Sequence, residues 1–307
     1  MLRAFFVGLS ENRTIRGFAE RSTIGQKLSS RFVAGTTIHD AVTATQSLNQ
    51  LAMHVSLDNL GENVTNADEA RASAELYEQI LNEIQTLQLD ANVSVKLTHM
   101  GFDVDEQLAR DIVGSLVAKA AAMQPKNFVR VDMEGSPYTQ RTLDLVHNLH
   151  GQPGNQGCVG AVIQAYLFRS EKDIEDLLAK GIRIRLCKGA YKEAGDIAFQ
   201  EKSEVDQNYV KLMKTLMKSG VYHGLATHDE SIIQQAVAFA QAEKIPPAAF
   251  EFQMLHGIRR DLQQKLVHDG WNVRVYIPFG TEWYPYFMRR LGERPANAIF
   301  ILKNLFR

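Results

Sequence analysis

Eight short runs of apolar, largely β-branched residues recur along the chain, and each is followed by polar residues and then by a longer amphipathic stretch. Such runs are typical of strands, and apolar residues spaced three and four apart are typical of helices that bury one face. The predicted strands are 52–57, 93–97, 128–133, 159–165, 182–187, 222–226, 250–254 and 273–277. The predicted helices are 67–87, 105–123, 139–149, 171–180, 204–218, 230–243, 258–268 and 283–291.

Capping residues support several of these boundaries. Asn66, Ser170 and Asp229 stand directly before predicted helices and are residue types that cap helix N-termini. Gly181 and Gly270 follow predicted helices, where glycine commonly ends a helix.

The alternation of eight strands with eight helices predicts an α/β fold, a (βα)8 TIM-type barrel. The alternative is a doubly wound open sheet, but the GxGxxG fingerprint of its nucleotide-binding versions is absent. Two further helices are expected near 11–30 and 38–51. We therefore expect an N-terminal helical extension, 1–51, packed on a barrel formed by 52–307, with the final helix over the barrel mouth.

Composition limits the function classes. The chain has 307 residues, and 34 Lys and Arg against 35 Asp and Glu give a net charge of -1, which argues against a nucleic-acid-binding protein. The two cysteines form no CxxC pair and no metal is predicted, so a reducing, cytoplasmic location is favoured. No apolar stretch approaches the roughly 20 residues of a spanning helix, which leaves at most a peripheral membrane contact.

Polar residues gather where the predicted strands end, which is where barrel enzymes place catalytic groups. They are Asp58, Lys96, Thr98, Asp132, Glu134, Gln164, Arg185, Lys188, Thr227, His228, Gln253 and Tyr276. The cations among them suit an anionic ligand or a cofactor that gains negative charge during reaction. Lys96 or Lys188 could instead form the Schiff base of a barrel aldolase, and a non-catalytic ligand-binding barrel is the third alternative.

The final predicted helix carries Tyr286, Arg289 and Arg290 on neighbouring positions. Two guanidinium groups beside a phenol could hold a small carboxylate in bidentate fashion. A solvated basic face is the ordinary interpretation of an Arg-Arg pair, but the position after the eighth strand favours ligand binding.

Several segments together resemble the proline dehydrogenase family. They are SVKLT at 94–98, RLCKGAY at 185–191, LATHD at 225–229, EFQML at 251–255, and 276–297 with YFMRRL at its centre. The resemblance implies a distorted (βα)8 barrel that binds FAD non-covalently. It also implies oxidation of L-proline to pyrroline-5-carboxylate, with electrons passed to a quinone, and peripheral contact with the inner face of the cell membrane.

The resemblance also assigns roles to single residues. Asp132 and Arg185 would be catalytic, with Arg185 near flavin N5. The implied substrate-binding residues are Lys96, Leu186, Tyr191, Tyr276, Tyr286, Arg289 and Arg290. The implied FAD-binding residues are Met133, Gln164, Arg185, Lys188, Gly189, Ala190, Thr227 and His228. Thr36 stands where many relatives have a glutamate that pairs with the first arginine of the clamp, so an ion-pair gate is in doubt.

Overall fold

Eight parallel strands close into a barrel in the computed structural model, which describes residues 30–293, with side chains up to residue 288. Each strand pairs with its neighbour in sequence, and β8 returns to pair with β1 over six residues. The strands are β1 (His54–Asn59), β2 (Ala91–Val95), β3 (Val129–Val131), β4 (Val159–Gln164), β5 (Arg183–Cys187), β6 (His223–Ala226), β7 (Phe250–Leu255) and β8 (Val273–Phe279). The closed order confirms the predicted barrel and excludes the open sheet.

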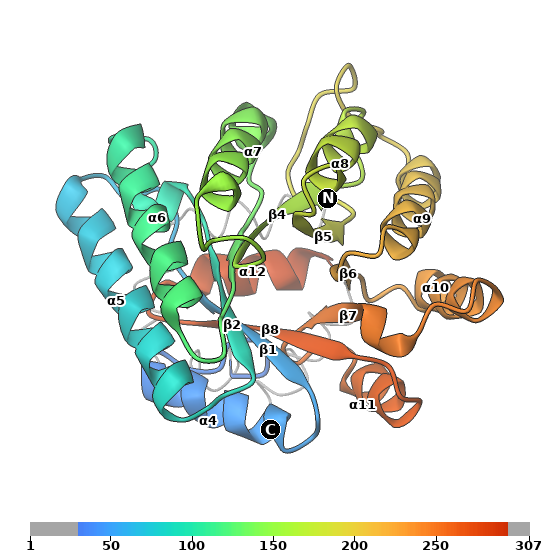
Figure 1. The fold of residues 1–307 in the computed structure, drawn as a ribbon, viewed down its shortest axis with the longest axis horizontal. Coiled ribbons are helices and arrows are strands. Elements are labelled where there is room, and N and C mark those ends of the chain that lie inside the picture. The colour runs from blue at the N-terminus through green and yellow to red at the C-terminus, as the bar shows by residue number, and fades with distance from the viewer. Residues whose placement is uncertain (1–29, 294–307) are drawn as a thin grey trace.

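Helices surround this barrel, with α5 to α11 on the outside of the strands and α12 across the centre of the view (Figure 1). The helices of the described chain are α4 (Ile38–Asn49), α5 (Ala67–Thr86), α6 (Glu106–Ala122), α7 (Ser136–Gly151), α8 (Ser170–Leu178), α9 (Lys202–Lys218), α10 (Glu230–Ala242), α11 (Arg260–His268) and α12 (Trp283–Glu293), with short 3-10 turns η1 (Thr98–Met100) and η2 (Pro247–Ala249). The helix expected near 38–51 is α4, whereas the one near 11–30 lies outside the described residues.

Two of the three predicted N-terminal caps are present. Asn66 accepts a hydrogen bond from the Glu69 amide at 2.9 Å, and Asp229 accepts one from the Ser231 amide at 3.2 Å. The prediction for Ser170 is wrong, because α8 already includes this residue. Its hydroxyl donates to the carbonyl of Gln164 at 2.5 Å and so satisfies the end of β4 instead of the start of the helix.

Apolar side chains fill the layer between the strands and the helices. On α5, Tyr77, Ile80, Leu81 and Ile84 recur at helical spacing and are at most 2% exposed. Burial of each such side chain stabilises the fold by about 1.5–3 kcal/mol. The ring of helices is therefore held to the barrel by hydrophobic contact.

The inside of the barrel is polar. Arg130, Glu251, Gln253 and Arg274 are all buried, and they alternate along their strands with residues of the outer hydrophobic core. Because neighbours along a strand point to opposite faces, these polar side chains fill the barrel interior. A buried polar group without a partner is costly, so the interior depends on hydrogen bonds and ion pairs.

The C-terminal end of the barrel is covered by α12. Trp283, Tyr286 and Phe287 of this helix pack in one hydrophobic cluster with Phe32 and Leu60. The amide of Leu60 donates to the carbonyl of Phe279 at the end of β8, at 2.7 Å. The final helix thus lies beside the strand ends, where the sequence predicts it.

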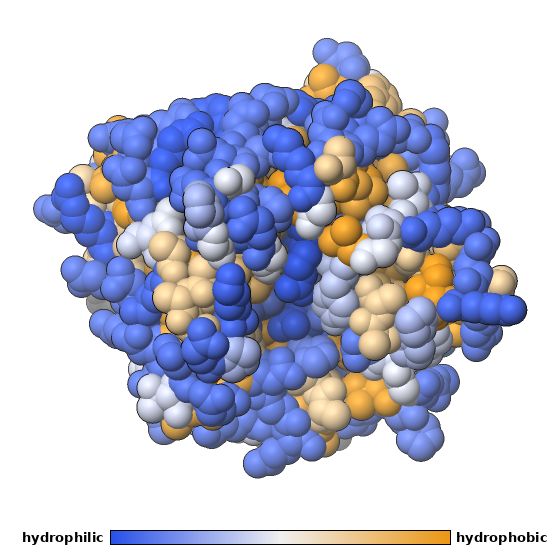
Figure 2. Space-filling model, viewed as in Figure 1, coloured by the Kyte–Doolittle hydropathy of each residue, from blue (hydrophilic) through white to orange (hydrophobic). Residues whose placement is uncertain are grey.

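The face of the molecule seen in Figure 2 is mainly hydrophilic, with separate small hydrophobic areas. Among the helices that the structure describes, none combines the length and the hydropathy that a membrane crossing requires.

Candidate active site

Three side chains from three strand ends meet at the C-terminal end of the barrel. Arg185 of β5 donates from Nη1 to Oδ1 of Asp132 at 2.7 Å. The Tyr276 hydroxyl, from β8, donates to Oδ2 of the same carboxylate at 2.8 Å. The Arg185 guanidinium also lies over the Tyr276 ring, 5.1 Å from its centroid. The sequence predicts all three, and the structure brings them together.

The remaining edges of the Arg185 guanidinium are also bonded. Its Nη2 donates to the hydroxyls of Ser56 at 3.2 Å and Ser94 at 3.0 Å, and its Nε donates to Oε1 of Gln253. Arginine presents its donors in a rigid plane, so these three partners and Asp132 together fix both the position and the tilt of the cation.

Gln253 links this group to the centre of the barrel. Its Nε2 donates to Oε1 of Glu251 at 2.6 Å. Since a carboxylate only accepts and a guanidinium only donates, this amide must present its nitrogen to Glu251 and its oxygen to Arg185. Space for the amide comes from Gly224, where a Cβ would lie 2.3 Å from Nε2 of Gln253.

Glu251 is ion-paired at the centre of the barrel. Arg274 donates from Nε to Glu251 at 2.7 Å, and the Tyr222 hydroxyl donates to its other oxygen at 2.9 Å. Burial opposes the charge of Glu251, but the Arg274 guanidinium and these hydrogen bonds lower its pKa to about 2. The carboxylate is therefore ionised at any ordinary pH.

Four residues of this network were not assigned to the site from the sequence, although a signal for them exists: the two serines that bond to Arg185, and the ion pair behind Gln253. Ser56, Ser94, Glu251 and Arg274 each stand two positions before a polar residue at a strand end. A spacing of two places both residues on the same face of a strand. The alternation that predicts the strands could thus have predicted the polar interior.

Lys96 forms a second ion pair at the barrel mouth. Its Nζ lies 2.8 Å and 3.0 Å from the two carboxylate oxygens of Asp58. Burial alone would lower the pKa of Lys96, but Asp58 and the more distant Asp132 raise it above the usual value. Tyr276 likewise keeps its proton, because burial next to Asp132 raises the pKa of its phenol.

The charged state of Lys96 argues against this lysine as the nucleophile of the aldolase alternative, because a Schiff-base lysine needs a lowered pKa and a free lone pair. We expect no adduct on Lys96 when the protein is treated with a small aldehyde and then borohydride near pH 7. Mass spectrometry of tryptic peptides measures this. Preferential trapping at Lys96 over the exposed Lys211 would contradict the ion pair described here.

Comparison with known proteins identifies the family. The family model described as proline dehydrogenase matches residues 41–303. Proline dehydrogenase 1 of Bacillus subtilis strain 168 is 39% identical over 308 residues, which covers 100% of both chains. The proline dehydrogenase of Deinococcus radiodurans is 38% identical over 283 residues, covering 91% of this chain and 90% of that relative. The chain belongs to the proline dehydrogenase family.

Solved structures show the same barrel. Proline utilization A (PutA) from Bdellovibrio bacteriovorus matches with a TM-score of 0.80 at 23% identity, over 87% of this chain and 32% of that one. This proline dehydrogenase chain therefore spans about a third of the length of that PutA protein.

The end of β4 and the loops after β5 and β6 hold most of the residues for which the family resemblance implies cofactor contact. Gln164 donates to the carbonyl of Glu134 at 3.0 Å and accepts from the amide of Ala190 at 3.2 Å, so it ties two loops together. Gly189 has a φ of +130°, and a Cβ there would lie 2.5 Å from the Tyr166 ring. Only glycine fits this close turn.

Lys188 and the residues after β6 are anchored by neighbouring helices. Lys188 forms ion pairs with Asp229, at 2.9 Å, and with Asp206. The Thr227 hydroxyl accepts from the amide of Asp229 at 3.1 Å. Nε2 of His228 accepts from the Leu255 amide at 2.9 Å, which places the proton of the neutral ring on Nδ1.

The other predicted site residues lie apart from this polar group. Leu186 and Met133 are buried in the main hydrophobic core, and Tyr286 is buried in the cluster under α12. Tyr191 is exposed in the loop after β5. Positions 289 and 290 lie on α12, but the side chains of Arg289 and Arg290 are outside the described part of the structure.

Thr36 lies in a turn organised by Asp40. The amides of Thr36 and Thr37 both donate to Oδ2 of Asp40 at 3.0 Å. The Thr37 side chain accepts from the Asp40 amide, which completes a capping box at the start of α4. This segment therefore satisfies its own polar groups.

Proposed function

We propose that this proline dehydrogenase oxidises L-proline to pyrroline-5-carboxylate with a non-covalently bound FAD, and that a quinone accepts the electrons. The observation that carries the proposal is the Arg185 guanidinium, which is buried and fixed by Asp132, Gln253 and two serines at the barrel mouth. A fixed cation at this place would stabilise negative charge that develops as proline is oxidised.

The residues around the mouth fit a flavin. Arg185 and Lys188 place cationic groups, each paired with a carboxylate, beside the loop in which Gly189 allows close approach of the backbone. The other residues that would hold FAD are Met133, Gln164, Ala190, Thr227 and His228. When bound, FAD would accept the hydride from the carbon next to the ring nitrogen of proline.

The chain's own residues would bind and orient the substrate. Arg289, Arg290 and Lys96 would hold the carboxylate of proline, which sets the reacting carbon by orientation. Tyr276, Tyr286, Tyr191 and Leu186 would enclose the ring. The amine must lose its proton before oxidation, because only the neutral amine has a free lone pair on its nitrogen.

An absorption spectrum tests the cofactor and the reaction together. We expect the purified protein to be yellow and its visible flavin band to bleach when L-proline is added without oxygen. D-proline serves as the control, since a substrate of the wrong hand presents a different hydrogen to the acceptor. A colourless protein, or a band that L-proline leaves unchanged, would contradict the proposal.

Substitution of Arg289 tests the carboxylate clamp. In the Arg289→Ala variant we expect KM for proline to rise on the order of 30-fold or more, because one charge-assisted bidentate contact contributes about 2–4 kcal/mol. Flavin content should stay normal. An unchanged KM would show that Arg289 does not hold the substrate.

Electron transfer to a quinone that is dissolved in a membrane requires contact with that membrane. We place the protein in the cytoplasm, with peripheral contact at the inner face of the cell membrane. Reduction of a soluble quinone analogue by proline tests whether a quinone is the electron acceptor. The same measurement with liposomes added tests the contact with a membrane.

A further inference from the structure

A cavity of about 370 Å³ lies at the end of the barrel opposite the candidate active site. It is bounded by the N-terminal ends of strands and by the C-terminal ends of α5 and α6. Its charged lining residues are Asp90, Lys126, Arg183 and Arg274. We propose that this cavity binds a small multivalent oxyanion, such as a phosphate-bearing or dicarboxylate metabolite, with Arg183 as its main ligand.

The guanidinium of Arg183 is fixed in position by two aromatic rings. It lies between them, 4.3 Å from the centroid of Phe128 and 4.9 Å from that of Tyr222. Stacking holds the plane but leaves the hydrogen-bonding edges unused. Within the described residues Arg183 has no ion pair, and its buried Nε has no hydrogen-bond partner.

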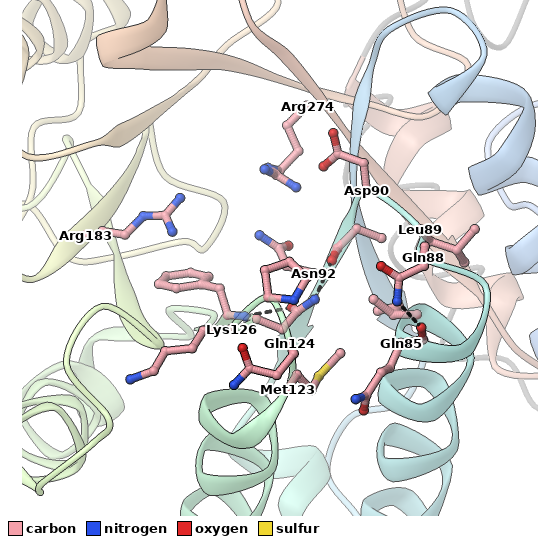
Figure 3. Close-up of a pocket in the computed structure, with 15 residues that line it drawn as sticks. Gln85, Gln88, Leu89, Asp90, Asn92, Met123, Gln124, Lys126, Arg183 and Arg274 are labelled. Carbon is pink, nitrogen blue, oxygen red and sulfur yellow. Dashed lines mark hydrogen bonds between the residues drawn. The ribbon is translucent and has the colours of Figure 1, made fainter.

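Arg274 enters the same space from another side, as Figure 3 shows, with both guanidinium groups directed into the cavity. Arg274 differs from Arg183 because Glu251 neutralises it. Arg183 is thus the arginine of the pair that has no ion-pair partner within the described chain.

Glu251 is the carboxylate whose charge acts most strongly on Arg183, but it forms its ion pair with Arg274. Asp90 is paired with His54 at 2.5 Å, and Lys126 donates to the carbonyl of Gly154 at 2.9 Å. Arg130 lies next to the cavity without lining it. Its guanidinium donates to the backbone carbonyls of Ala161 and Arg183 at 3.0 Å and 2.9 Å. Cations therefore outnumber carboxylates here, and an anion would relieve their repulsion.

Amide groups add neutral donors around the two arginines. Asn92 accepts from the Ser56 hydroxyl through Oδ1 at 2.7 Å, which leaves its NH2 group for the cavity side. Gln85, Gln88 and Gln124 also line the cavity. Planar guanidinium and amide donors together match the paired oxygens of a phosphate or carboxylate.

Thermal unfolding of the full chain tests the site. Inorganic phosphate and, in a second series, succinate are titrated at constant ionic strength set with chloride, in the presence of saturating L-proline. We expect a saturable rise in Tm, because a ligand that binds only the folded state stabilises it. The anion that binds more tightly identifies the class of ligand.

Two variants separate the site from general salt effects. Arg183→Gln should weaken anion binding about tenfold or more, and Arg183→Lys should weaken it less, because lysine keeps the charge but loses the planar fork. Lys211→Gln, on the exposed face of α9, removes the same charge and should bind the anion like the parent protein. The proposal is overturned if the parent shows no saturable response, or if Arg183→Gln and Arg183→Lys both respond like the parent. If Arg183→Gln does not fold, the comparison of Arg183→Lys with the parent decides.

Discussion

Replacement of Glu251 by alanine is expected to lower the free energy of unfolding by about 3–5 kcal/mol, the usual cost of removing one partner from a buried ion pair. Glu251 is 0% exposed and bonded to Arg274, Gln253 and Tyr222. Its loss leaves the buried Arg274 without a counter-charge and frees the Gln253 amide to turn. Urea unfolding followed by circular dichroism measures the change.

An exposed pair provides the matched control. Asp269 pairs with Lys265 at 2.5 Å on the surface of α11. Removal of such a pair costs at most about 0.5 kcal/mol, so Asp269→Ala should unfold nearly like the parent. If Glu251→Ala and Asp269→Ala have the same effect, the central ion pair does not stabilise the barrel.

The same carboxylate gives the stability a defined pH dependence. The folded-state pKa of Glu251 is lowered to about 2, below the value of about 4.3 in an unfolded chain. Its stabilisation is therefore complete above the unfolded pKa and is lost as the pH falls from about 4 toward 2. The difference in stability between the parent and Glu251→Gln should narrow over that range.

The second large effect is expected at Arg185. Arg185→Lys should slow the reduction of bound flavin by proline about 100-fold or more, which is the usual loss when one preorganised charge donor is removed from an active site. Lysine retains the charge, but a single ammonium cannot reach Asp132, Gln253 and both serines. Stopped-flow absorbance without oxygen measures the rate directly.

Controls separate this effect from misfolding. Arg259 is paired at the surface with Glu230 and Asp261, so Arg259→Lys should react at the parental rate. Flavin content and Tm should be recorded for both variants. An Arg185→Lys variant that is reduced as fast as the parent would mean that the plane of the guanidinium has no role in the reaction.

The alternation of strands and helices predicts the barrel because each strand and each helix has a hydrophobic pattern within its own segment of the sequence. The strand ends follow from the same pattern, and so the sequence alone groups Asp132, Arg185 and Tyr276 at one end of the barrel. The Ser170 prediction failed because a serine before a helix can cap it or satisfy a preceding strand, and only the fold decides which.

Other features depend on contacts that no local pattern contains. The pairing of Lys96 with Asp58 joins residues 38 positions apart, and that of Lys188 with Asp229 joins residues 41 apart. Sequence reasoning counted both lysines as available cations, whereas the folded chain neutralises each with a carboxylate. That Arg183 lacks an ion pair at the opposite end of the barrel is likewise visible only in the fold, where Glu251 pairs with Arg274.

The lack of a Cβ at Gly224 restricts which residues can stand at this position in related proteins. Any larger residue at 224 would occupy the place of the Gln253 amide, so the two positions must change together. Relatives with alanine or serine at the position of Gly224 should carry a shorter side chain at that of Gln253, and their arginine on β5 should take a different neighbour. Covariation between the positions of Gly224 and Gln253 across the family would thus distinguish the members in which a side-chain amide orients the arginine on β5.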